Sequence, residues 1–135
     1  MLLKDVIKPL KVKNILPLLE DIASHRQEHF VVMTLNNNNE VIKKHIVFIG
    51  TVNATIVHPR EVFACALEDG AVSIAVAHNH PSDDPEPSRA DIEMTQQLVS
   101  AGQILAIKLH DHIIVAGNDH YSFRENGMLP QKTVD

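Results

Sequence analysis

Apolar residues recur along this chain at two spacings, one typical of helices and one typical of strands. Helical spacing predicts helices over residues 14–25, 58–69 and 89–101. Apolar or alternating runs predict strands over residues 28–35, 41–49, 72–77, 104–109, 112–116 and 121–123, with a short extended piece at 52–56. Helices interleaved with strands indicate an α/β layered domain with a mixed sheet.

Turn and cap residues delimit these elements. Four consecutive asparagines, residues 36–39, separate the first two strands, which are therefore expected to form a hairpin. Gly70 and Gly102 are expected to end two of the helices as C-cap residues. We predict a single domain of 135 residues, with a loose arm at residues 1–12 and a loose tail at 128–135.

Composition argues against several classes of protein. The formal net charge of −5 disfavours a surface that neutralises phosphates, and an aromatic content of 4% disfavours platforms that stack single-stranded bases. The single cysteine, Cys65, excludes an internal disulfide and a multi-cysteine zinc site, and its apolar surroundings predict a place in the core. Without an apolar segment near 18 residues or a signal sequence, the protein is expected to be soluble and cytoplasmic, with no membrane contact.

The candidate chemistry lies where a predicted strand meets the third predicted helix. His78 and His80 follow the apolar strand 72–77 and are separated by one residue. Residues i and i+2 lie on the same side of an extended backbone, so both imidazoles can reach one metal ion. The prolines within residues 81–87 exclude a helix there and predict a loop that returns toward the ion. Asp91 would then supply the third ligand.

Ser88 is expected to begin the third helix. Its spacing to Asp91 is that of a capping box, with Ser88 as the N-cap. A hydroxyl beside a metal could also donate to an oxyanion, so a catalytic role for Ser88 is compatible with the cap. Three protein ligands leave a fourth position for water, as in catalytic zinc sites. The alternative is a pair of hydrogen-bonded loop histidines beside a capping acid.

Other histidine motifs fit this segment less well. Ser82 and Asp83 stand where a metallo-β-lactamase-type His-x-His-x-Asp-His sequence needs aspartate and histidine. A zinc deaminase needs a Pro-Cys-x-x-Cys sequence, which a chain with one cysteine does not contain. A His-Glu-x-x-His sequence is also absent. The letters His-Asn-His alone are no evidence for a nuclease.

The order His-x-His-Pro, seven residues between His80 and Ser88, then Ser-x-x-Asp resembles the JAMM signature of JAB/MPN metalloproteases. Further stretches resemble the RadC-like bacterial branch of that family, which carries an old DNA-repair name. These stretches are residues 57–63, 77–82, 87–92, 111–114 and 121–123. The resemblance covers about residues 25–127 and implies a three-layer α/β/α, cytidine-deaminase-like fold with a zinc site.

The resemblance also implies a mechanism. The glutamate of the signature falls on Glu28, at the start of the first strand, where the alternative is a solvated acid. Glu28 would take a proton from the zinc-activated water and pass it to a leaving amine, while zinc and Ser88 hold the oxyanion. With Zn²⁺ held by His78, His80 and Asp91, the implied reaction is hydrolysis of a peptide or isopeptide amide in an unidentified peptide or protein substrate.

Two features depart from the RadC-like pattern. Asp83 stands where related chains usually have glycine after His-Pro-Ser, which adds negative charge beside the site and leaves the substrate preference open. Longer members also carry an N-terminal helix-hairpin-helix module, a plausible DNA contact, which this chain is expected to lack.

The roles of His58 and Asp111 each have two interpretations. His58 either caps a helix or takes part in chemistry, and Asp111 either orients a metal-bound imidazole or forms a turn. The rival to a hydrolase is a DNA-repair-associated or protein-binding module that keeps the fold and the metal site without hydrolysis. The family name favours nucleic acid, and the acidic charge opposes it. The oligomeric state does not follow from the sequence.

Overall fold

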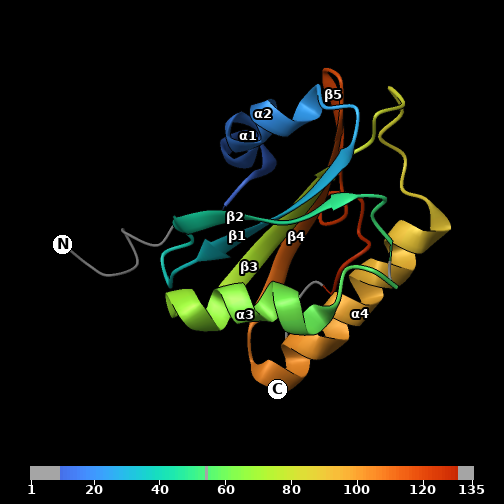
Figure 1. Ribbon diagram of the computed structural model, residues 1–135. Helices are drawn as coiled ribbons and strands as arrows, with labels where there is room; N and C mark the ends of the chain where they lie inside the picture. Colours follow the sequence, from blue (N-terminus) through green and yellow to red (C-terminus); the bar gives the residue numbers. More distant parts are fainter. Residues whose placement is uncertain (1–9, 54, 131–135) are drawn as a thin grey trace.

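The computed structural model describes residues 10–53 and 55–130, and within them a five-stranded mixed sheet forms the centre (Figure 1). The strands are β1 (Glu28–Leu35), β2 (Val41–Gly50), β3 (Ser73–Asn79), β4 (Lys108–Ala116) and β5 (Asp119–Ser122), in the spatial order β2-β1-β3-β4-β5. β3 and β4 are parallel, and the other neighbouring pairs are antiparallel. The predicted α/β domain with a mixed sheet and a β1–β2 hairpin is confirmed.

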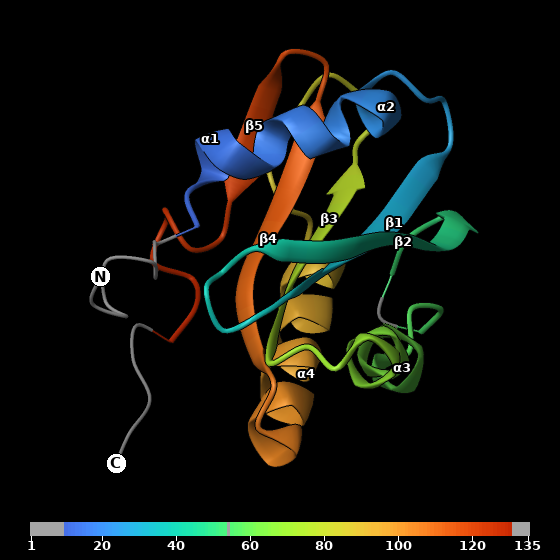
Figure 2. The same ribbon diagram turned by 90° about the vertical axis from the view of Figure 1, so that its left-hand side faces the viewer.

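Helices cover both faces of the sheet (Figures 1 and 2). One face is covered by three short segments, which are α1 (Val12–Ile15), the 3-10 helix η2 (Leu16–Leu19) and α2 (Glu20–Ala23). The other face is covered by α3 (Pro59–Asp69) and α4 (Arg89–Leu105). A separate apolar cluster fills each interface, so the layers are arranged α/β/α as the resemblance implied.

Strand alternation divides the core between the two faces. Phe30 and Val32 of β1 pack with α3 and α4, whereas Val31 and Met33 pack with the helical segments of residues 12–23. β3 is buried along its whole length, as expected for a strand covered on both faces. Polar side chains of β3 therefore lie in the interior, where they need hydrogen-bond partners.

β4 is a single strand where two were predicted, at 104–109 and 112–116. Ile104 belongs to the end of α4, and its side chain is 86% exposed. The register of β4 against β3 skips one residue, His110. Because of this bulge, His112 reaches the α3 and α4 face of the sheet, where its ring contacts Phe30.

α4 continues beyond its predicted C-cap. Gly102 lies inside the helix, and Ala106 ends it with a left-handed φ of 58°. Gly102 is buried, and the carbonyl group of Ile107 occupies the space that a Cβ atom would need. Close packing therefore explains this glycine. Gly70, by contrast, ends α3 with a φ of 64°, as predicted.

Two local predictions were wrong. The piece predicted as extended at 52–56 contains a turn, in which the Ile56 amide donates to the Asn53 carbonyl at 3.2 Å. Residue 54 lies outside the described residues. Cys65 is half-buried on α3 and packs against the core cluster from outside, whereas a place within the core was predicted.

Parts of the predicted arm and tail lie within the described residues, and one residue of each is buried. Val12 begins α1 and is buried, so helical structure starts before residue 14 and ends at Ala23. Leu129 is also buried in the core. The rest of both predicted segments, residues 1–9 and 131–135, lies outside the described residues.

Gly102→Ala tests the close packing at the end of α4. Alanine gains about 1 kcal/mol of helix propensity, but overpacking costs roughly 1–3 kcal/mol, and contact with a backbone oxygen, which cannot move aside cheaply, belongs to the upper part of that range, about 2–3 kcal/mol. We expect urea unfolding to show a loss of about 1–2 kcal/mol in the free energy of unfolding. The exposed neighbour Gln103→Ala is the control, with a change below about 0.5 kcal/mol. Equal stabilities for the two variants would contradict the packing argument.

Candidate metal centre

The end of β3 and the beginning of α4 bring the predicted ligand residues together. His78 lies near the end of β3, where its ring stacks on Phe30, and His80 follows the strand. Asp91 enters from the first turn of α4. His78 and Asp91 are buried, whereas His80 is half-buried at the surface. The end of β3 and the N-terminus of α4 thus face each other, and the site is open to solvent on the side of His80.

Three side chains meet at this point within short distances. The Nε2 atoms of His78 and His80 are 3.2 Å apart. Asp91 places Oδ1 3.2 Å from Nε2 of His78 and Oδ2 3.0 Å from Nε2 of His80. Two imidazole nitrogens and one carboxylate therefore converge, as the motif spacing predicted.

Asp91 also belongs to the capping box that starts α4. Its amide donates to Ser88 Oγ at 3.1 Å, and the Ser88 amide donates to Asp91 Oδ2 at 2.9 Å. Although burial opposes ionisation, close contacts with the His78 and His80 rings hold the pKa of the Asp91 carboxyl far below its ordinary value. The contact with Asp91 in turn raises the pKa of His80. The predicted cap is confirmed, and the Ser88 hydroxyl, which accepts as the cap, keeps its hydrogen for donation to a further acceptor.

Glu28 completes the cluster from the first residue of β1. One of its carboxylate oxygens and one ring nitrogen each of His78 and His80 all lie within 4.8 Å of one another. Glu28 Oε1 accepts a hydrogen bond from the Val52 amide at 2.8 Å. Glu28, His78 and His80 form a group that could hold a metal ion, with Asp91 approaching both imidazoles from α4.

Asn79, the middle residue of the motif, points to the opposite face of β3 and holds the chain around Glu28. The His29 amide donates to Asn79 Oδ1 at 2.6 Å. Asn79 Nδ2 donates to the carbonyl oxygens of His25, at 3.2 Å, and Gln27, at 3.1 Å. This buried amide therefore fixes residues on both sides of Glu28.

A second polar layer lies behind His78. Its Nδ1 atom is 2.9 Å from Nε2 of His112, whose Nδ1 atom is 2.6 Å from the Thr95 hydroxyl. The His112 ring is fully buried, stacked on Phe123 with ring centroids 4.8 Å apart. Burial in this apolar setting lowers the pKa of His112 well below its ordinary value.

The two other residues considered from sequence have structural contacts. Asp111 does not face the imidazoles of the cluster. Its carboxylate accepts from the Ser122 hydroxyl at 2.6 Å and from the Arg124 amide at 3.0 Å, which joins β4 to the segment after β5. Burial raises the pKa of Asp111. His58 occupies the N-cap position of α3 without a side-chain capping bond.

Sequence reasoning missed His112, Thr95 and Asn79. His112 directly follows Asp111, and the bulge that turns it toward His78 has no clear sequence signal. A polar residue inside an apolar strand run is the signal that could have identified it. Thr95 is buried on α4, one turn after Asp91, where a helical wheel anchored on Asp91 would have placed it on the same face.

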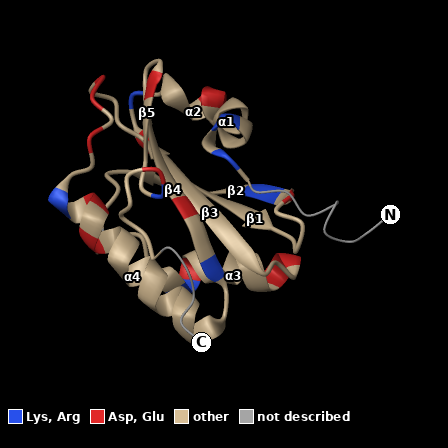
Figure 3. Ribbon diagram, turned by 180° about the vertical axis from the view of Figure 1, so that it is seen from behind, with Lys and Arg blue, Asp and Glu red and all other residues tan. Residues whose placement is uncertain are grey.

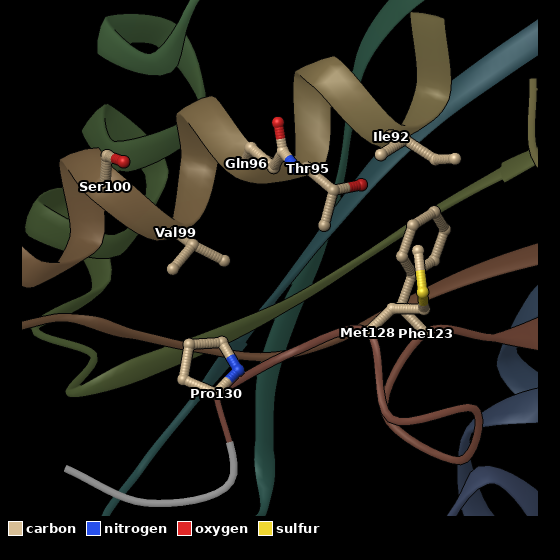
Figure 4. Close-up of a pocket in the computed structure, with 8 residues that line it drawn as sticks. All are labelled: Ile92, Thr95, Gln96, Val99, Ser100, Phe123, Met128 and Pro130. Carbon is tan, nitrogen blue, oxygen red and sulfur yellow. The ribbon is translucent and has the colours of Figure 1, made fainter. Parts of the chain in front are cut away.

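Two cavities lie near these residues. An open cavity of about 350 Å³ borders Glu28 and is lined also by Arg26, Thr51 and Pro81. Another, of about 230 Å³, lies between α4 and the segment 123–130, and its lining residues are all non-ionisable (Figure 4). Of these two cavities, the first is therefore the one that borders a residue of the cluster, Glu28.

The loop beside the exposed side of the cluster carries negative charge. Figure 3 shows acidic residues in the loop between β3 and α4. This loop contains exposed Asp83, Asp84 and Glu86. His80 Nδ1 lies 3.0 Å from the carbonyl oxygen of Asp84, so the loop is tied to the cluster. Among the described residues, no helix has the length and apolar character required to cross a membrane.

Comparisons with known proteins agree with this architecture. The family model of the RadC-like JAB domain matches residues 7–128. UPF0758 proteins of Bacillus licheniformis, Bacillus cereus and Bacillus pumilus are 53%, 48% and 47% identical to this chain over 112, 112 and 111 residues. These alignments cover 83%, 83% and 82% of the chain and 50% of each relative, so the chain spans about half the length of the curated relatives it matches.

The match extends over nearly all the described elements, from α1 to β5. It also contains every residue of the cluster. The chain therefore belongs to the RadC-like JAB domain family.

Proposed function

We propose that this domain is a zinc-dependent hydrolase that cleaves a peptide or isopeptide amide. His78, His80 and Asp91 would hold the ion, Glu28 would act as the general base, and Ser88 would donate to the oxyanion. The observation that carries the proposal is the convergence of two imidazole nitrogens and a carboxylate within 3.2 Å of one another.

The donor set fits a cation. A carbonyl oxygen only accepts hydrogen bonds, so the contact with the Asp84 carbonyl holds a His80 proton on Nδ1 and leaves Nε2 as the nitrogen that an ion would bind in place of a second proton. Nε2 faces the Nε2 atom of His78 and an ionised Asp91. Without a proton or a cation between them, these groups repel one another. Two nitrogens and one oxygen are a ligand set that zinc accepts, with room for solvent.

The residues around the ion would divide the chemistry among them. Zinc, when bound, supplies Lewis-acid polarisation of the scissile carbonyl and acidification of water. Glu28 Oε1 is held by the Val52 amide, which orients the carboxylate, so the other oxygen can take a proton from water and deliver it to the leaving amine. The Ser88 hydroxyl, at the helix mouth beside Asp91, can donate to the oxyanion.

A peptide or protein substrate agrees with the charge of the site better than DNA does. The exposed acidic loop lies directly beside His80, and carboxylates there would repel phosphates. The cavity that borders Glu28 is open to solvent, so a substrate could approach this carboxylate from outside. The DNA-associated alternative requires binding that falls steeply with salt, and the acidic loop opposes such binding.

Metal analysis of the purified protein tests the ligand set. The wild type is expected to bind one zinc ion per chain, and His80→Ala to weaken binding by at least about 100-fold, because one of three ligands is lost. Competition with a chromophoric chelator measures the affinity. His120→Ala, which changes a half-buried histidine of β5, is the control. A folded His80→Ala protein that binds zinc as tightly as the control would exclude this ligand set.

Glu28→Gln separates metal binding from hydrolysis. The variant is expected to keep its zinc and to lose about 10²–10⁴-fold in rate, because glutamine does not accept the proton. The assay uses a quenched fluorescent peptide library and isopeptide-linked peptides. Glu20→Gln, an exposed change on α2, is the control and should retain the wild-type rate. Equal rates for the two variants, on a substrate that the wild type cleaves, would refute general-base catalysis by Glu28.

Asn79→Ala tests whether the placement of Glu28 depends on the buried amide. Losing three hydrogen bonds, among them the bond that the buried His29 amide donates, should lower the free energy of unfolding by about 1–3 kcal/mol, measured in urea. The hydrolysis rate should fall at saturating zinc, while the zinc affinity changes only a few-fold. Asn36→Ala, in the turn after β1, is the control for loss of an asparagine amide remote from Glu28. A fully active Asn79→Ala enzyme would show that Glu28 is held by other contacts.

A further inference from the structure

We propose that His112 and Thr95 form a positioning pair that keeps the proton of His78 on Nδ1 and so leaves its Nε2 lone pair facing the metal cluster. The inference deepens the proposed function, on which its zinc-binding part rests. His112 and Thr95 are not among the proposed ligands, and they act through His78.

The Thr95 hydroxyl sets the direction of the hydrogen bonds. Thr95 Oγ1 is 2.8 Å from the main-chain carbonyl oxygen of Asp91 and 2.6 Å from Nδ1 of His112. A carbonyl oxygen has no proton to offer, so the single hydroxyl proton lies between Thr95 and Asp91. Oγ1 is then the acceptor toward His112, and the His112 proton is on Nδ1.

The same reasoning continues from His112 to His78. A neutral imidazole with its proton on Nδ1 has a lone pair on Nε2. Nε2 of His112 lies 2.9 Å from Nδ1 of His78, so His78 must donate its Nδ1 proton. Its Nε2 atom, 3.2 Å from Nε2 of His80, is then free to bind an ion. The opposite direction would place the His78 proton on Nε2 and block a ligand position.

Packing holds the His112 ring in one orientation. Its side chain is fully buried, with the Phe123 ring stacked against it and the Phe30 ring meeting it edge-on at 6.1 Å between centroids. Thr95 is 2% exposed and lies one turn after Asp91 on α4. Figure 4 shows Thr95 on α4 across the cavity from Phe123. α4 therefore supplies both the Asp91 carboxylate and the Thr95 hydroxyl, which orients the ring of His112.

A second hydrogen bond, from His112 to Thr95, is needed because the partner of His78 is itself an imidazole. Metal-binding histidines usually donate to a carboxylate or a carbonyl group, which can only accept. His80 has such a partner in the Asp84 carbonyl. His112 could either donate or accept, so its own proton must be fixed by Thr95. Without that hydroxyl, both tautomers of His112 become accessible.

Nitrogen-15 NMR of the histidine rings tests the tautomer directly in the metal-free protein. The expected spectrum shows His112 neutral, with a protonated Nδ1 and an unprotonated Nε2. A wild-type spectrum with the His112 proton on Nε2 overturns the inference. The measurement does not depend on zinc, so a wild type that binds no zinc would contradict the proposed function while the spectrum still decides the tautomer.

Thr95→Val and Thr95→Ser test the effect on the metal site. Valine has nearly the volume of threonine without the hydroxyl, whereas serine keeps the hydroxyl. Thr95→Val should show a mixed His112 tautomer and a zinc affinity lowered by about tenfold or more, the usual range for loss of a partner behind a ligand. Thr95→Ser should keep the wild-type tautomer and an affinity within about twofold. Equal zinc affinities for the valine and serine variants would overturn the positioning role.

His112→Gln and His112→Leu provide a matched pair at the next position. Glutamine can offer a carbonyl acceptor to His78 Nδ1, and leucine cannot. The inference predicts that His112→Gln retains more zinc affinity than His112→Leu, with both variants shown to be folded by circular dichroism. Weaker zinc binding by the glutamine variant would contradict the requirement for an acceptor.

Discussion

Asp91 connects the beginning of α4 to the imidazoles at the end of β3, and the geometry of the site depends on this connection. Its Oδ2 atom accepts from the Ser88 amide at 2.9 Å and faces His80 at 3.0 Å, while Oδ1 faces His78 at 3.2 Å. A buried carboxylate costs several kcal/mol unless its oxygens have partners. Both sets of partners are therefore needed, and α4 cannot shift along the sheet without loss of one of them. The helix is held in place by the same atoms that could hold an ion.

The sheet supplies the other half of this arrangement. β3 is covered on both faces, so its alternation directs His78 to the α4 side and Asn79 to the opposite side, where it holds the start of β1. The parallel neighbour β4 brings His112 beside His78, but only because its bulge skips His110. Glu28 and His112 thus reach one imidazole from the strands on either side of β3. A one-residue change of register in either strand would turn the corresponding side chain to the wrong face.

Features set by neighbouring residues could be predicted from the sequence. The His-x-His spacing, the Ser88–Asp91 capping box and the asparagine turn are local patterns, and the structure contains all three. Features set by tertiary contacts could not be predicted in the same way. A glycine at the end of a helical pattern, such as Gly102, predicts a C-cap. Only the position of the Ile107 carbonyl group shows that this glycine is needed for packing. Asp111 was the more obvious partner for an imidazole, because carboxylates usually have that role. The bulge in β4 at His110 places His112, and not Asp111, beside His78.

The two imidazoles of the cluster are oriented by different kinds of partner, and this difference bears on the departure of the loop from the family pattern. His80 depends on the Asp84 carbonyl, in an exposed loop that also contains Asp83, whereas His78 depends on buried groups. Near Gly117, an added Cβ atom would lie 3.5 Å from Asp83 Oδ1, so this aspartate sits close to the β4–β5 turn. A change of loop shape acts directly on His80, while the negative charge of the loop favours cations at the open side of the site. The ring of His78 is oriented by His112 on its buried side, so its orientation does not depend on a loop carbonyl as that of His80 does.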